Sequence, residues 1–237
     1  MNRLSTLAAA LSVIVFSTAC APKSDSDSQA DAEDVSLAGF WRLSGTSESY
    51  DIVVDDSGRY MAFNGNGLLT GNSTESIYQS GNTVYASGYA CSLSRGECGT
   101  LSYELDIDSS TELSGTVTDG IDTGNVSARK ITSMDTEVTL ADIANKTWVS
   151  TTNATATLVI YSDGSLQGTL DDGSAYTANV KDTGQNAFNF TAQAAISGTT
   201  YTIPGMAYVD SSDRLVSGGV LRNGDEFLML YYIATVQ

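Results

Sequence analysis

An internal repeat constrains the fold of this chain more than any other feature. Trp148 is followed by a polar, threonine-rich stretch, an apolar run and a turn that ends at Gly164. In the first half of the chain the same order of features runs from Trp41 to Gly58, and the two spacings differ by one residue. The repeat predicts two similar units in tandem, which we place at residues 37–133 and 134–237.

Composition and turn residues indicate that both units are built from β-strands. The 237 residues include 22 glycines, 12 tyrosines and only two prolines, and threonine and valine are common. β-branched and aromatic residues favour strands, and glycine permits the tight turns between them. Alternating runs between turn signals predict about eight strands per unit. We therefore expect an all-β fold of two tandem antiparallel β-barrel or β-sandwich units, with one continuous sandwich as the alternative.

Each predicted unit opens with a tryptophan. In the first unit Trp41 closely follows Gly39, and this opening resembles the first strand of lipocalin-like and avidin-like barrels. The resemblance implies a barrel whose interior can hold a small apolar ligand. Trp41 and Trp148 are therefore the candidate walls of a ligand cavity. The alternative is that each tryptophan plugs or anchors a filled core.

The first twenty residues predict an export signal. Arg3 precedes an apolar segment, Leu4–Phe16, that has signal-peptide length and is too short for a transmembrane helix. The following Ser17-Thr18-Ala19-Cys20 resembles the lipobox of bacterial lipoproteins. That resemblance implies cleavage before Cys20, attachment of diacylglycerol to its thiol, acylation of its amine and, with Ala21 next, export to the outer membrane. The alternative is an ordinary signal peptide cleaved at the same place.

The segment after the signal predicts a spacer. Residues 20–36 begin with the lipidated cysteine and continue with serine, aspartate and alanine, so they have little apolar surface to bury. Mutually repelling acids keep such a segment disordered and extended. We expect residues 1–19 to be the signal peptide and 20–36 a flexible acidic tether. The anchored protein would then lie on the periplasmic face of the outer membrane or on the cell surface.

The two remaining cysteines predict a structural disulfide. Cys91 and Cys98 flank six residues between two strand-like runs, and in an exported protein this spacing favours a bond across the neck of a hairpin. A zinc site would need further cysteine or histidine ligands. A redox pair is more often a CxxC motif at the start of a helix.

Charge and composition exclude several functions. The net charge of −17 opposes binding to nucleic-acid phosphates and to anionic lipid surfaces. The chain has no histidine, which removes Ser-His-Asp and Cys-His catalysis and nearly all catalytic zinc sites. Its aspartates gather at predicted turns, where they act as turn formers or, alternatively, as calcium ligands. We expect no catalytic residue, no metal and no other cofactor, and so no enzyme.

These observations favour a non-enzymatic binding or structural module on the outer membrane, which contacts a protein or an envelope polymer through its loops. The alternative is a lipocalin-like carrier of a small apolar ligand. A carrier needs an emptied barrel interior, whereas a contact module fills its interior with side chains. The many large apolar strand residues favour the filled interior.

Overall fold

The computed structural model describes residues 35–45, 49–64, 77–92, 94–95, 97–134, 137–151, 156–170, 173–184, 186–196, 198–224 and 226–237, and the backbone of 67–71. Residues 33–237 form one compact unit. The described residues form 17 strands and two short helical segments, η1 (Thr132–Met134) and α1 (Leu140–Ile143). No helix of this part of the chain has the length and apolar character needed to cross a membrane.

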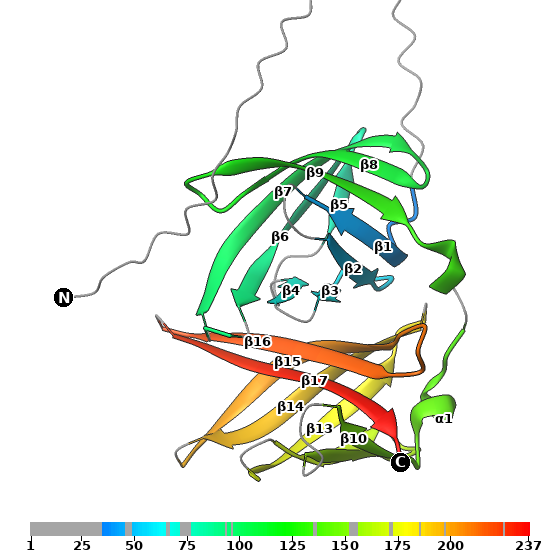
Figure 1. The fold of residues 1–237 in the computed structure, drawn as a ribbon, viewed down its shortest axis with the longest axis vertical. Helices are drawn as coiled ribbons and strands as arrows, with labels where there is room; N and C mark the ends of the chain where they lie inside the picture. The colour runs from blue at the N-terminus through cyan, green and yellow to red at the C-terminus, as the bar shows by residue number, and fades with distance from the viewer. Residues whose placement is uncertain are drawn as a thin grey trace, which may run out of the picture. The chain divides into compact units, whose positions relative to one another are not determined.

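The second half of the chain forms a closed antiparallel barrel (Figure 1). Consecutive strands pair in chain order, and the last strand returns to the first, with Trp148 opposite Val236. The strands are β10 (Thr147–Ser150), β11 (Thr157–Ile160), β12 (Ser165–Thr169), β13 (Ala175–Asp182), β14 (Ala187–Ile196), β15 (Thr199–Val209), β16 (Leu215–Asn223) and β17 (Glu226–Val236).

The first half forms a nine-stranded sheet in the order β4-β3-β2-β1-β9-β8-β7-β6-β5. An additional pairing of β4 with β6 links the two sides of this sheet into a ring. The strands are β1 (Gly39–Ser44), β2 (Ser49–Val54), β3 (Tyr60–Phe63), β4 (Gly67–Gly71), β5 (Tyr78–Ser80), β6 (Thr83–Ser92), β7 (Glu97–Ser109), β8 (Glu112–Thr118) and β9 (Thr123–Lys130).

The two rings have the same strand order once β4 and β5 are taken together. β4 pairs with the second half of β6, from Gly71 opposite Gly88 to Gly67 opposite Ser92. β5 pairs with the first half of β6. In the second barrel the single strand β13 pairs along β14 in both of these places. The first ring is therefore the same up-and-down arrangement with one strand interrupted. We refer to this ring also as the first barrel.

The predicted all-β fold of two antiparallel units is confirmed, and the two sheets are separate rather than one continuous sandwich. β4 departs from expectation, because the glycine-rich stretch that starts at Asn64 predicts a loop up to Gly67 and no strand after it. A strand with glycines at both ends lacks the alternation of apolar and polar residues by which strands are recognised.

Side chains of alternate strand residues fill each ring. In β1, Trp41 and Leu43 point into the first ring, where both are buried with residues from β2, β3 and β6–β9. In the second barrel, Trp148 on β10 lies opposite Leu158 on β11, as Trp41 lies opposite Ile52, and both are buried in that barrel's core. Each half of the chain thus has its own apolar core, as the period of two along its strands requires.

A third apolar cluster lies between the two barrels and uses the outward-facing residues. Phe40 packs edge-on against Tyr208 with ring centroids 5.5 Å apart. Tyr89 meets Phe227 in the same way at 5.2 Å. We call this set the interbarrel cluster; its buried members are Phe40, Val53, Met61, Tyr89, Cys91, Ala187, Met206, Tyr208, Val216 and Val220.

The interbarrel cluster explains the composition of β17, which is apolar along most of its length. Leu230 and Tyr232 point into the second barrel, whereas Phe227, Met229 and Ile233 pack against the interbarrel cluster. Apolar contacts on both faces therefore replace the usual apolar-polar alternation of an antiparallel strand, although Tyr231 on the outward face is 40% exposed.

A polar contact also joins the barrels. The Asn189 side chain on β14 donates from Nδ2 to Oδ2 of Asp55 at 2.7 Å, and Asp55 is only 2% exposed. The other oxygen of Asp55 accepts hydrogen bonds from Ser57 N, Ser57 Oγ and Arg59 N within the β2–β3 turn. Because its oxygens accept these four bonds, the carboxylate is buried without losing its hydrogen-bond partners.

We expect Phe40→Ala to destabilise the protein by about 3–5 kcal/mol, because Phe40 is fully buried between the barrels. The matched control Ile121→Ala removes an apolar side chain that is 87% exposed, and we expect a change within about 0.5 kcal/mol. Urea unfolding followed by circular dichroism measures both. Equal stability of the two variants would contradict the interbarrel cluster as a stabilising contact.

Candidate functional site

The two predicted cavity residues have the same local environment in the two barrels. Trp41 Nε1 donates a hydrogen bond to the Leu37 carbonyl oxygen at 2.8 Å, and Trp148 Nε1 donates to the Ile143 carbonyl oxygen at 3.0 Å. Both indoles are buried. Each tryptophan therefore satisfies its polar atom with the main chain just before its own strand, which leaves only the apolar ring to face the barrel interior.

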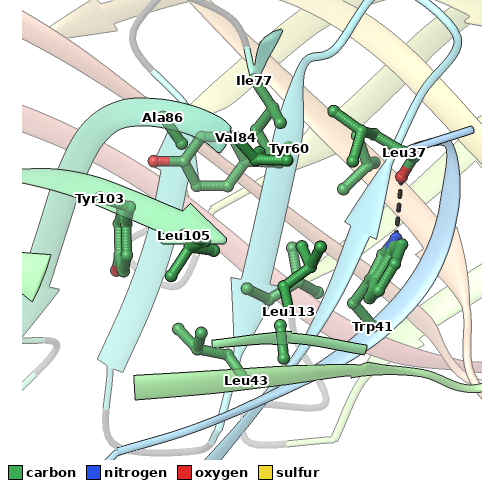
Figure 2. Close-up of a pocket in the computed structure, with 13 residues that line it drawn as sticks. Leu37, Trp41, Leu43, Tyr60, Ile77, Val84, Ala86, Tyr103, Leu105 and Leu113 are labelled. Carbon is green, nitrogen blue, oxygen red and sulfur yellow. Dashed lines mark hydrogen bonds between the residues drawn. The ribbon is translucent and has the colours of Figure 1, made fainter. Parts of the chain in front are cut away.

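The interior of the first ring contains a cavity of about 50 Å³ (Figure 2). Trp41 forms part of its wall, and Figure 2 shows its bond to Leu37 at one side of the cavity. None of the described lining residues is acidic or basic. They are Leu37, Trp41, Leu43, Ile52, Val54, Tyr60, Ile77, Val84, Ala86, Tyr103, Leu105, Leu113 and Ala128.

The interior of the second barrel is more completely filled. Its cavity measures about 20 Å³, and Trp148 is not among the described residues that line it. Large rings occupy the space over glycines: a Cβ added at Gly168 would lie 2.6 Å from the Tyr176 ring, and one at Gly205 would overlap Phe190. The rings of Tyr176 and Phe190 therefore fill the space left by residues without side chains.

The two tyrosines that line the interior of the first ring are uncharged. Burial raises the pKa of Tyr60 and of Tyr103 well above the usual value of a phenol, and repulsion from Tyr103 raises that of Tyr60 further. Both phenols are therefore protonated at neutral pH. The described lining of this interior offers apolar contact and no ionised group for acid-base chemistry.

The volume of the first cavity limits what it can hold. An engineered apolar cavity of about 150 Å³ is large enough for benzene, whereas one water needs only about 10–15 Å³. At about 50 Å³ the first cavity is smaller than the benzene site, so an apolar ligand of that size enters only if lining side chains move. The apolar walls equally disfavour water, which needs polar partners.

The predicted cysteine pair is joined across a hairpin. Cys91 on β6 lies directly opposite Cys98 on β7, with the two sulfur atoms 2.02 Å apart. Cys91 is buried in the interbarrel cluster and Cys98 packs against it. The sequence predicts the pairing but not this location, because nothing in the local pattern shows that the hairpin meets the second barrel. Cys20 lies outside the described residues.

The aspartates at turns bond their own backbones. Asp119 accepts hydrogen bonds from Ile121 N and Asp122 N, and Asp163 accepts from the amide and hydroxyl of Ser165. These bonds hold the pKa of Asp119 and of Asp163 below the usual range. Both carboxylates thus act as turn formers. Among the described residues no group of three or more His, Cys, Asp and Glu could hold a metal ion, and the predicted turn at 171–172 lies outside them.

We expect Ala86→Val to stabilise the protein by about 0.5–2 kcal/mol, because the added methyl groups enter the cavity of the first ring. The same substitution at Ala178, beside the smaller cavity of the second barrel, is the matched control. We expect Ala178→Val to cost about 1–3 kcal/mol through overpacking. Valine favours strands in both places, so the difference in unfolding free energy between the variants reports the available space. Identical effects would contradict the difference in filling.

Comparison with known proteins leaves the chain without an assigned family. No family model, no curated protein and no solved structure matches it. The resemblances of the Cys20 segment to a lipobox and of the Trp41 segment to lipocalin-like and avidin-like barrels therefore stay predictions. What the protein does has to be inferred from its own residues and geometry.

Proposed function

We propose that the protein is a lipid-anchored lipoprotein of the bacterial outer membrane whose β-barrels act as a non-enzymatic binding or structural module. The observation that carries this proposal is the filling of both barrels. Their interiors leave about 50 Å³ and 20 Å³, so the outer surfaces and loops are the parts available for contact. A contact module differs from a carrier in this respect.

The N-terminal sequence supports the anchoring part of the proposal. Cys20 follows an apolar segment of signal length, and the first strand among the described residues begins at Gly39. Several acyl chains on one cysteine supply the stable membrane binding that a single chain lacks. The segment between Cys20 and the barrel would let the module reach a partner in the envelope.

The charge of the chain supports the choice of partner class. A net charge of −17 opposes nucleic acid and anionic lipid surfaces, where affinity depends on Lys and Arg. The same charge leaves neutral envelope polymers and neutral or cationic proteins as partners.

We expect Cys20→Ser to move the protein from the membrane fraction to the soluble fraction and to abolish its labelling by radioactive palmitate. Fractionation of an expressing Gram-negative bacterium measures this. The matched control Cys98→Ser removes a different cysteine and should leave anchoring and labelling intact. If Cys20→Ser stays in the membrane fraction and takes up label, the protein is not anchored through Cys20.

A carrier of a small apolar ligand is the second candidate, and the first ring is the observation that favours it. Its cavity is lined by Trp41 and other residues without charge, and it is larger than that of the second barrel. Binding would require movement of lining side chains such as Leu105 or Tyr60.

Native mass spectrometry distinguishes the two candidates. We expect the exported protein, purified gently and without chelator, to show only the mass of its processed, acylated and disulfide-bonded chain, because the cavities are small. An additional small-molecule mass that disappears on denaturation would favour the carrier. Loss of that mass in a Leu105→Trp variant, which fills the first cavity, would place the ligand there.

A further inference from the structure

A groove of about 340 Å³ lies where the two barrels meet, within the compact unit of residues 33–237. The first barrel contributes Asp51 and Phe63, from β2 and β3. The second contributes Tyr208 from β15 and the turn of Asp210 to Arg214 that follows it. This volume falls at the lower end of the range of about 300–1,000 Å³ typical of small-molecule sites.

Tyr208 lines this groove and bears a hydroxyl group. The residue is only 4% exposed and its ring packs against Phe40, yet its hydroxyl forms no hydrogen bond to any of the described residues. Burial raises the pKa of Tyr208, and the nearby carboxylates of Asp51 and Asp210 raise it further. The phenol is therefore protonated and able to donate. Among the described residues only Asn189 has a fully buried side-chain polar atom without a partner, so the Tyr208 hydroxyl is open to the groove and can donate to a ligand there.

The charged residues at the groove are balanced in pairs. Arg42 donates from Nε and Nη2 to the two carboxylate oxygens of Asp51, at 2.8 Å and 3.1 Å. Arg214 Nη2 lies 2.6 Å from Oδ2 of Asp210. Because each carboxylate has its own arginine, the groove has little net attraction for an ion. It instead offers strong donors and acceptors side by side, which suits hydroxyl groups that both donate and accept.

The remaining lining of the groove is mixed, with Asn64, Ser211 and Ser212 as polar members and four apolar residues beside them. Phe63, Met134, Val216 and Ile233 supply surface for carbon-bound hydrogens. A purely aliphatic ligand would displace the water that hydrogen-bonds to Tyr208 and to the ion pairs. It would not replace those hydrogen bonds, and the loss would cost binding free energy. A molecule with hydroxyl groups on some edges and an apolar face on another satisfies both kinds of wall.

We propose that the interbarrel groove binds a neutral, hydroxyl-bearing ring of about the size of one sugar unit, with Tyr208, Asp51 and Arg214 as its hydrogen-bonding residues. The inference rests on the proposed binding module and names the class of its ligand, the neutral glycan part of an envelope polymer.

The test compares three sugars that differ mainly in charge. Isothermal titration of the full-length protein with N-acetylglucosamine, glucosamine and glucuronate should show binding of the neutral sugar, at least fivefold tighter than of the cationic or the anionic one. Absence of N-acetylglucosamine binding to the folded protein, or tighter binding of either charged sugar, overturns the proposal.

Two variants locate the site. Tyr208→Phe keeps the ring that packs on Phe40 and should weaken N-acetylglucosamine binding about fivefold, the effect of one hydrogen bond. The control Tyr161→Phe changes a partly exposed tyrosine outside the groove lining and should bind as the wild type does. Asp51→Asn leaves Arg42 uncompensated and should shift the preference towards glucuronate. Unchanged binding in both groove variants, with unfolding midpoints like that of the wild type, overturns the proposal.

The two proposals fail independently. An anchored protein that binds none of the three sugars overturns the glycan site and leaves the outer-membrane module in place. A protein that binds N-acetylglucosamine through Tyr208 but keeps no lipid on Cys20 overturns the anchoring and supports the groove.

Discussion

Burial of the outward-facing apolar residues between the barrels is the constraint on which the rest of the structure depends. A small barrel normally buries one face of each strand and exposes the other. Here Phe40, Val53 and Met61 on one barrel and Met206 and Val216 on the other would form large exposed patches if the barrels separated. Their contact also determines the surroundings of Asp55, of the Cys91–Cys98 hairpin and of Tyr208.

Much of the fold could be predicted because local sequence patterns indicate it. The repeated Trp41 and Trp148 indicate the duplication, and alternation along β7 and β13 indicates strands with one buried face. The apolar run in β17 indicates burial on both faces. Local patterns do not reveal β4, whose glycines hide its alternation, nor which distant residues cover the outer face of β17, because that partner lies on the other barrel.

The candidate sites were harder to predict, because they depend on cavity volumes and on which distant residues meet in the fold. Trp41 could be placed at a barrel wall from its position on the opening strand. The cavity beside Trp41 could not be derived, because its size depends on how the interior side chains pack. In the second barrel the rings of Tyr176 and Phe190 fill the region over Gly168 and Gly205, whereas the first barrel keeps a larger cavity. Likewise Tyr208 is one of 12 tyrosines, and only the fold shows that it lines a groove between the barrels.

The strands that form the interbarrel cluster are largely non-equivalent in the two repeats. The first barrel contributes mainly β1–β3, whereas the second contributes β14–β17, which correspond to β6–β9 of the first. Between identical units a contact of this kind is head-to-tail, and unless the rotation closes a ring it adds units without end. Residues such as Glu104 and Asp106 on the exposed side of β7 are acidic and offer no such apolar face. The first repeat therefore lacks on β7 the apolar outer face that the second repeat presents on β15.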